Sequence, residues 1–285
     1  MLLQRVITAV VLVALLLVSL LASSPWPFAL LTLALLSAGG WEWGRLNHAA
    51  HGLALAMGAA VALAGLAALA AGWTTQSPAA LWWAVFGLWL VGGAVALRSG
   101  PSAWPQLPRA ARWGLGLVAL WAAWLALAQA RHIGINFMLS VLCLVWMADV
   151  AAYFGGRALG RRKLAPGISP GKSWEGVWSG VAGVALLALF WVWLDGRFGV
   201  DGPSVYSRLL TSLGAAGLTA AVLLLCGLSV VGDLVESLVK RAAGAKDSSR
   251  LLPGHGGVLD RVDALLPVLP AALALTALTA AGFGR

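Results

Sequence analysis

The amino-acid sequence predicts an all-α, polytopic integral membrane protein with about nine transmembrane helices. Hydrophobic residues make up 61% of the 285 residues and charged residues only 10%, and the mean hydropathy is +0.90. Long runs such as residues 6–21 and 53–71 contain no charged residue. Apolar runs of roughly 17 to 25 residues are long enough to cross a bilayer as a helix. No polar insertion is long enough to fold by itself, so any chemistry must use helix ends and loops.

The N-terminal half contains five such runs, which predict helices at residues 6–23, 26–40, 53–72, 80–97 and 113–130. The connection at residues 23–27 is tight, and Trp41 can belong to a longer second helix. A signal peptide is an alternative for the first run, because Arg5 precedes it and small residues end it. We expect an uncleaved helix, since the charged segment before it is weak and many spans follow.

The C-terminal half predicts four more helices, at residues 136–154, 176–194, 209–231 and 264–282. Residues 1–130 therefore form an N-terminal set of helices, and residues 131–285 form a C-terminal catalytic region. Two loops of this region, residues 155–175 and 240–263, carry most of its charged side chains and are expected at the cytoplasmic face. Cys143 and Cys226 fall inside helices without CxxC spacing or a nearby histidine, which is typical of packing residues.

The distribution of Lys and Arg predicts the orientation. If the N-terminus is cytoplasmic, 15 of the 19 Lys and Arg residues fall on that side, and such an excess is typical of cytoplasmic loops. The predicted topology is N-in, C-out. The formal net charge of +9 is explained by this topology and by contact with anionic membrane lipid, so nucleic acid is not an expected partner.

The first polar segment, residues 149–176, joins the sixth and seventh predicted helices. Asp149 and Tyr153 are one turn apart and can share a face. Glycines follow among basic residues, a composition that lets backbone N–H groups and guanidinium groups approach phosphate, although lipid contact or topology alone would also explain it. Lys172 and Ser173 stand at the start of the seventh helix, where the dipole favours an anion. A Walker A motif is excluded, because the glycine spacing fails and no strand is expected before Gly171.

The second polar segment, residues 233–263, begins inside the eighth helix. Asp233, Glu236, Ser237 and Lys240 are spaced i, i+3, i+4 and i+7, so they form one polar face. Acids this close to membrane depth are costly, which favours a functional role; a structural ion pair with Lys240 is the alternative. Asp260 and Asp263 share a face at the start of the last helix, as do residues three apart in general. Carboxylates with interspersed cations suit a nucleoside triphosphate and a hard divalent cation such as Mg²⁺.

Both segments resemble the phosphatidate cytidylyltransferase family, also called CDP-diacylglycerol synthases. The matching positions in the second segment are Ser237, Lys240, Arg241, Lys246, Asp247, Pro253, His255, Gly256, Gly257, Asp260, Arg261 and Asp263. Those in the first are Asp149, Ala152, Tyr153, Gly156, Arg157, Gly160, Ser169, Pro170, Lys172, Ser173, Glu175 and Gly176. In residues 1–130 only hydropathy and Glu42–Trp43 fit. Ser249 departs from the family pattern, where glycine or alanine is commoner.

The resemblance implies a membrane enzyme that converts CTP and phosphatidate to CDP-diacylglycerol and pyrophosphate, with Mg²⁺ and, in some members, a monovalent cation such as K⁺. Asp233 and Asp260 are the expected first metal ligands, with Asp263 and Asp247 as supporting acids. The expected catalytic residues are Asp233, Lys240, Lys246, Asp247 and Asp260. The expected substrate-binding residues are Arg157, Lys172, Ser173, Ser237, Arg241, His255, Gly256, Gly257 and Arg261.

Further expectations concern the membrane. The lipid should enter sideways, through a cleft between the eighth and ninth helices and the 155–175 loop, because exposing acyl chains to water costs about 0.8 kcal/mol per methylene. The expected location is a bacterial inner membrane with the site on the cytoplasmic side. Small-residue pairs such as Gly92–Gly93 would allow close helix packing within a protomer or in a homodimer.

Two alternative functions suit parts of this pattern. A secondary transporter for an anionic solute would also use intramembrane acids, but here the charges cluster at one membrane face and the two halves contain no matching broken helices. A related lipid cytidylyltransferase or a CTP-dependent polyprenol kinase would need similar groups. The match across residues 255–263 favours the phosphatidate enzyme.

Overall fold

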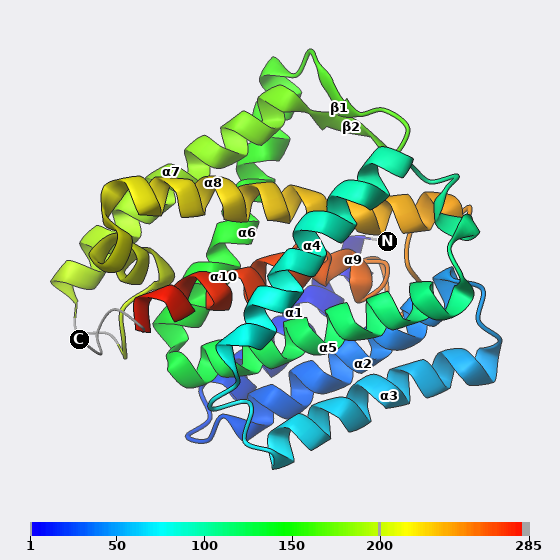
Figure 1. Ribbon diagram of the computed structural model, residues 1–285, viewed down its shortest axis with the longest axis horizontal. Helices are drawn as coiled ribbons and strands as arrows, with labels where there is room; N and C mark the ends of the chain where they lie inside the picture. Colours follow the sequence, from blue (N-terminus) through cyan, green and yellow to red (C-terminus); the bar gives the residue numbers. More distant parts are fainter. Residues whose placement is uncertain (1, 199–200, 281–285) are drawn as a thin grey trace.

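The computed structural model describes residues 2–198 and 201–280, and its architecture is nearly all-α (Figure 1). The helices are α1 (Leu2–Leu20), α2 (Trp26–Leu46), α3 (His51–Ala70), α4 (Ala79–Ser99), α5 (Arg109–Ile133), α6 (Ile135–Leu159), α7 (Trp174–Arg197), α8 (Val205–Ala242), α9 (Leu259–Val262) and α10 (Leu265–Ala280). Each of the nine predicted segments overlaps one of them. Residues 281–282, the predicted end of the last helix, lie outside the described residues.

Seven helical segments are long and apolar enough to cross a membrane within the described part of the chain: α3 to α8, and residues 259–278 across α9 and α10. The chain is therefore an integral membrane protein. The other two predicted spans are helical too, but α1 offers only the shorter apolar stretch Val6–Leu20, and α2 carries Glu42 and Arg45 near its end. The number of spans supported by length and composition is thus seven.

Residues 155–175, expected to be a loop, contain more structure than the sequence suggested. α6 continues to Leu159, and a two-stranded antiparallel hairpin follows, formed by β1 (Lys163–Ala165) and β2 (Ser169–Ser173), with Lys163 opposite Ser173. The expectation that no strand precedes Gly171 is therefore wrong, because β1 comes before it and Gly171 itself lies in β2. The glycine spacing still excludes a Walker A motif.

α8 is longer than predicted. It begins at Val205 and ends at Ala242, with one non-helical residue, Gly214 (φ 68°, ψ −176°), which kinks it. The polar residues 233–240 remain helical because their face meets α9 and the hairpin rather than lipid. Ser173 and Ser204 cap the first turns of α7 and α8, accepting hydrogen bonds from Gly176 N and Ser207 N, as serine commonly does at this position.

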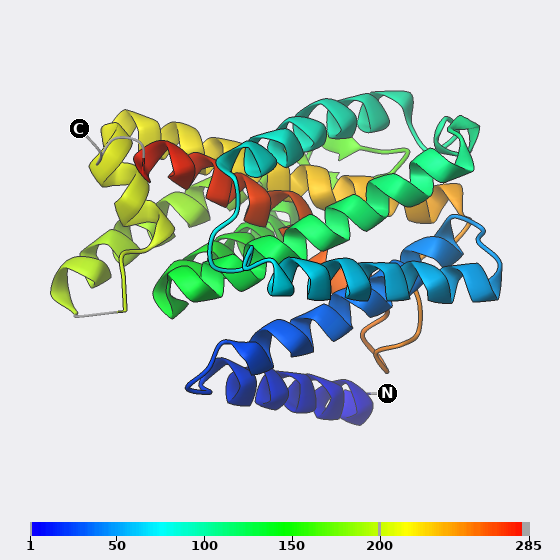
Figure 2. The same cartoon turned by 60° about the horizontal axis from the view of Figure 1, so that its bottom comes forward.

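The core of the bundle surrounds α5 and α10. In Figure 1, α10 lies between α8 and α5, and α4 crosses over it. Trp124, Phe137, Leu225 and Leu238 are among its fully buried side chains. α2 and α3 form an antiparallel pair, and α1 lies outermost beside α2 (Figure 2). α2 also contacts the short helix α9, so the N-terminal half reaches the second polar segment.

Candidate active site

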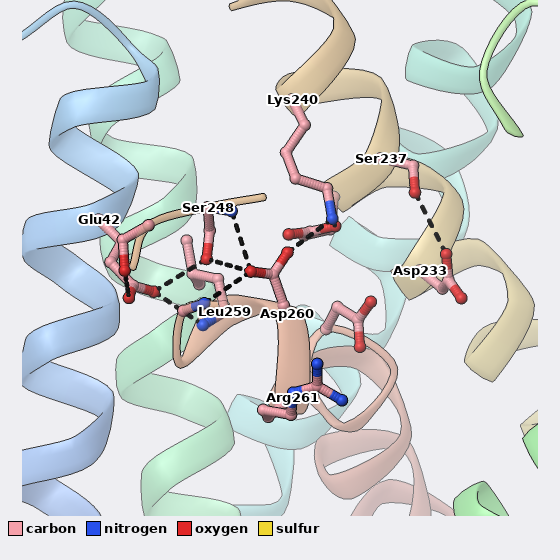
Figure 3. A network of polar contacts seen from close by, with 12 residues as sticks. Glu42, Asp233, Ser237, Lys240, Ser248, Leu259, Asp260 and Arg261 are labelled. Atoms are coloured by element: carbon pink, nitrogen blue, oxygen red, sulfur yellow. Dashed lines mark hydrogen bonds and ion pairs between the residues drawn. The ribbon is translucent and has the colours of Figure 1, made fainter. Parts of the chain in front are cut away.

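Asp260, at the start of α9, organises the loop that precedes it. Its Oδ2 accepts hydrogen bonds from Ser248 N (2.9 Å), Ser248 Oγ (2.8 Å) and Gly257 N (2.8 Å). Its Oδ1 lies 2.7 Å from Lys240 Nζ. Figure 3 shows these contacts converging on the Asp260 carboxylate from α8 and from the loop. Both oxygens therefore already accept from protein donors, which makes Asp260 a positioning residue in this conformation.

Lys240 links α8 to α9. Its ammonium group lies 2.5 Å from Glu236 Oε2, one turn earlier in α8, and 2.7 Å from Asp260 Oδ1, and the side chain is only 14% exposed. The structural ion pair that the sequence left open is thus present for Glu236, whereas Asp233 pairs elsewhere. Removing Lys240 would leave two buried carboxylates without their cation, and such a loss is strongly destabilising.

Asp233 joins the two polar segments. Its Oδ2 lies 2.6 Å from Lys172 Nζ in β2, and its Oδ1 accepts a 3.3 Å hydrogen bond from Ser237 Oγ. Arg241, on the same helix, donates from Nε to Ile168 O in the hairpin, at 3.3 Å. The hairpin is therefore fastened to α8 at two points.

A cavity of about 450 Å³ opens beside Asp233. Polar and charged residues of three elements form its rim: Asp149 and Arg157 from α6, Lys172 and Ser173 from the hairpin, and Asp233 from α8. Apolar and small residues of α6, α7 and α8 complete the lining. The 155–175 segment lines the cavity, as expected of the lipid cleft, but no lining residue comes from α9 or α10. The cavity therefore lies between the sixth, seventh and eighth helices and not between the eighth and ninth.

Asp263 lies between α9 and α10 and is not one of the residues that line this cavity. Its Oδ1 accepts a hydrogen bond from Ala264 N at 2.8 Å, and it is close enough to Asp233 and Asp149 to interact with both electrostatically. Within residues 2–198 and 201–280, no three His, Cys, Asp or Glu side chains converge as a ready-made metal site. Mg²⁺ usually keeps waters and substrate phosphates among its ligands and needs only one or two carboxylates. Asp233 and Asp263, which repel each other, fit that requirement.

Glu42 in α2 was not predicted as a site residue, although it is completely buried. Its carboxylate accepts hydrogen bonds from Val258 N (2.9 Å), Leu259 N (2.8 Å), Ser248 Oγ (3.2 Å) and Ser249 Oγ (2.6 Å). Figure 3 places it across the loop from Asp260. Two sequence signals pointed to it: the fit of Glu42–Trp43 to the family pattern, and an acid in a largely apolar helix, which is costly unless it has partners. Ser249, the departure from the family pattern, supplies one of these donors.

Two carboxylates hold the Gly256–Gly257 turn from opposite sides. Gly256 has φ 83°, and an added Cβ would lie 2.7 Å from Asp260 Oδ2. A Cβ on Gly257 would overlap Ser248 Oγ and Glu42 Oε1. Glycine is therefore required here by close approach as well as by backbone conformation.

We expect Gly257→Ala to lower both the melting temperature and turnover, because the methyl group must push Ser248 or Glu42 out of the network. Overpacking of this kind typically costs about 1–3 kcal/mol. Gly167→Ala, in the hairpin turn, is the matched control, since an added Cβ there meets nothing within 4 Å. Thermal unfolding and turnover of the two variants are compared; equal behaviour would contradict the packing argument.

The remaining predicted residues are placed less centrally. Arg261 donates from Nε and Nη2 to the carbonyl oxygen of His255, at 3.0 and 2.5 Å, while His255 Nδ1 is buried without a hydrogen-bond partner among the described residues. Arg157 donates to Tyr153 Oη at 3.2 Å. Lys246 and Asp247 are exposed and line a different hollow, beside Arg45 and Arg250, so they are not brought to Asp233.

Comparisons with known proteins agree with this site. The sequence model of the Cytidylyltransferase family matches residues 3–279. The chain is 40% identical to a phosphatidate cytidylyltransferase of Pseudomonas aeruginosa, over 100% of this chain and 99% of that protein. It is 46% identical to a phosphatidate cytidylyltransferase of Haemophilus influenzae over 48% of this chain and 44% of that protein.

One further relative carries no functional name. A protein of Escherichia coli called YnbB, described as uncharacterized, is 39% identical over 52% of this chain and 46% of its own length. The match to the family sequence model nevertheless covers almost the whole chain, α1 to α10. The resemblance found in the two polar segments is confirmed, and the protein belongs to the cytidylyltransferase family of enzymes.

Proposed function

We propose that the protein is a phosphatidate cytidylyltransferase, which converts CTP and phosphatidate to CDP-diacylglycerol and pyrophosphate. The observation that carries the proposal is the 40% identity, over the whole chain, to a protein of that name. The chemistry of the site supports it. Acids and cations from α6, the hairpin and α8 line one cavity together with apolar and small residues, and the Lys240–Asp260 ion pair joins α8 to α9.

The reaction needs no side-chain nucleophile. A phosphate oxygen of phosphatidate attacks the α-phosphorus of CTP, a new P–O–P bond forms, and the bond from the α-phosphorus to the β-phosphate bridging oxygen breaks as pyrophosphate leaves. The protein must align the two phosphates and stabilise the departing charge. We assign Lys240, Arg241 and Arg261 to phosphates of either substrate, as the sequence predicted. Lys246, the fourth predicted cation, lines a different hollow and is left out of this assignment.

The first polar segment would bind the phosphate of whichever substrate the cations of the second segment do not hold. Arg157, Lys172 and Ser173 line the cavity beside Asp233, and a guanidinium group matches phosphate geometry in a bidentate manner. Lys172 is 2.6 Å from Asp233, so an arriving phosphate would compete with that carboxylate for the ammonium group. Binding would thereby free an Asp233 oxygen.

Asp233 and Asp263 would hold the Mg²⁺ ion of the proposed reaction. The supporting observation is that Asp233 and Asp149 line the same cavity, with Asp263 near enough for its charge to act on both. Bound there, the ion would neutralise charge on the triphosphate and on the leaving pyrophosphate. Asp260, which the sequence placed among the ligands, is better suited to positioning because its oxygens already accept four hydrogen bonds or ion pairs. A monovalent cation stays a prediction of the resemblance.

The proposed setting is the inner membrane of a bacterium, with the N-terminus and the active site on the cytoplasmic side. The uneven distribution of Lys and Arg supports this orientation. With α1 and α2 counted, nine helices would cross the membrane. The lipid would reach the site sideways past α6 and α7, both of which expose large apolar side chains such as Trp146, Val150 and Trp178.

The test is pyrophosphate release by the purified protein in detergent, with phosphatidate and CTP, in the presence and absence of Mg²⁺. Turnover that needs all three components is the expected result. Undecaprenol in place of phosphatidate separates the alternatives, because a CTP-dependent kinase releases CDP and not pyrophosphate. A well-folded protein that releases neither product would overturn the proposed function and favour solute transport.

A further inference from the structure

A second polar cavity lies at the end of the bundle opposite to the catalytic acids. It has a volume of about 490 Å³ and is lined by the start of α4, the end of α5, the first turns of α8 and the end of α10. Its polar lining includes Ser77, Gln129, Ser207 and Arg208. The active-site residues of α8 stand near the other end of that helix, at Asp233 to Lys240.

Arg208 is the cation of this cavity, and the protein gives it no counter-charge. The half-buried guanidinium group donates from Nε to Pro203 O at 3.2 Å and stacks over the ring of Phe137, 5.3 Å from its centroid. Among residues 2–198 and 201–280, no Asp or Glu forms an ion pair with it. A partly buried guanidinium without an anion is costly, so a counter-ion from outside the chain would stabilise it.

The acids at this end of the bundle are committed to other groups. Asp195 accepts hydrogen bonds from Ser204 N, Ser207 Oγ and Asn136 Nδ2 at 2.6–2.9 Å. Asp201 accepts from Ile135 N (2.5 Å) and Asn136 N (3.0 Å), capping α6. Neither carboxylate turns to Arg208. The two acids therefore satisfy helix ends, and the guanidinium group of Arg208 is left without a carboxylate partner. This arrangement suits the binding of an anion.

The neighbouring donors suit a phosphate group. Gln129 uses its Oε1 to accept from Ser77 Oγ at 2.7 Å, which leaves its amide N–H groups as donors. Arg208 stands in the first turn of α8, where the helix dipole also favours negative charge. Arg offers two parallel N–H groups to phosphate oxygens. Trp82 and Leu273 add apolar surface to the lining, which suits an amphiphile better than a free ion.

The position of the cavity across the membrane favours a lipid as its ligand. Nineteen residues of α8 separate the kink at Gly214 from Asp233, which is about 28 Å of helix, close to the thickness of the hydrocarbon core of a bilayer; Arg208 lies beyond the kink. If the catalytic acids lie at one membrane face, Arg208 lies at the headgroup level of the other. We propose that this cavity binds the phosphodiester headgroup of an anionic phospholipid from the leaflet opposite to the active site.

This inference does not rest on the proposed reaction, and its test does not measure activity. The melting temperature of the purified protein is measured in detergent with added phosphatidylglycerol, with phosphatidylcholine, and with inorganic phosphate alone. A rise of a few degrees is expected with phosphatidylglycerol only, as for any ligand that binds the folded state. The rise should disappear in Arg208→Gln and persist in Arg197→Gln, whose exposed side chain lies at the same end of the bundle but outside the cavity.

Several outcomes would overturn the proposal. If phosphatidylglycerol raises the melting temperature of Arg208→Gln as much as that of the wild type, Arg208 does not bind the lipid. If phosphatidylcholine raises it equally, the site does not select a negatively charged headgroup. If inorganic phosphate alone raises it equally, the ligand is a free anion and not a lipid. If Arg208→Gln does not fold, Thr211→Trp tests the same point, because it fills the cavity from an exposed position and keeps the guanidinium group. Thr211→Trp should also lose the phosphatidylglycerol effect, and an unchanged effect would contradict the site.

Discussion

Replacing Asp233 with asparagine is expected to lower turnover by on the order of 10²-fold or more, which is the loss typical of removing one electrostatic contact to the reacting group. The melting temperature should stay close to that of the wild type, because relief of charge repulsion opposes the loss of the Lys172 ion pair. Among the described residues, the carboxylate is bonded to Lys172 and Ser237 alone, and its charge repels those of Asp263 and Asp149. Neutralising Asp233 removes this repulsion but also removes a charge that the reaction needs. Active sites commonly show this trade-off between stability and activity.

Asp260→Asn provides the contrast, because it should lower turnover and the melting temperature together. An asparagine there presents an amide N–H₂ group either to Lys240 or to the donors Ser248 and Gly257, leaving a buried group unsatisfied. Asp201→Asn, at the other end of the bundle, should leave the Mg²⁺ dependence of turnover unchanged. Wild-type turnover with unaltered Mg²⁺ dependence in Asp233→Asn would remove this residue from the reaction.

Hydropathy predicted the helices well because a bilayer selects for apolar runs of one characteristic length. Hydropathy failed where contacts between distant parts of the chain determine the structure. The hairpin at residues 163–173 is rich in glycine, proline and basic residues, so no strand periodicity stands out, and its fastening to α8 by Lys172 and Arg241 is a long-range effect. Hydropathy also ended the eighth helix too early, at residue 231, because residues 233–240 are too polar for a hydropathy window. Their polar spacing still indicated a helix, and their polar face has partners inside the protein.

The candidate site was predictable to the extent that its residues are neighbours in sequence. The i, i+3, i+4, i+7 spacing correctly placed Asp233 and Lys240 on one face of α8. It could not indicate that the two point to different partners, Lys172 in the hairpin and Asp260 in α9. Glu42 lies more than 200 positions from the loop it holds, so no local spacing rule connects them.

Replacing Glu42 with alanine is expected to lower the melting temperature by several degrees and turnover by about 10- to 100-fold, the range typical of groups that orient reacting residues. The change leaves Val258 N and Leu259 N without an acceptor in a site that water does not reach. Each buried donor left unsatisfied costs about 1–3 kcal/mol. Because Ser248 bonds both Glu42 and Asp260, the disturbance should pass to Asp260 and Lys240.

The kinetic pattern separates positioning from mere loss of stability. At a temperature where all variants are folded, Glu42→Gln keeps the shape of the side chain but replaces one acceptor oxygen by a donor, so it should lower kcat with less loss of stability than alanine. Thr32→Val on the same helix is the control: Thr32 is equally buried, but its hydroxyl donates only to Phe28 O and Ala29 O within α2. Its kcat should match the wild type. If Glu42→Gln also matched it, the Gly256–Gly257 turn would owe its position to Asp260 alone, and the N-terminal half would serve as scaffold without shaping the site.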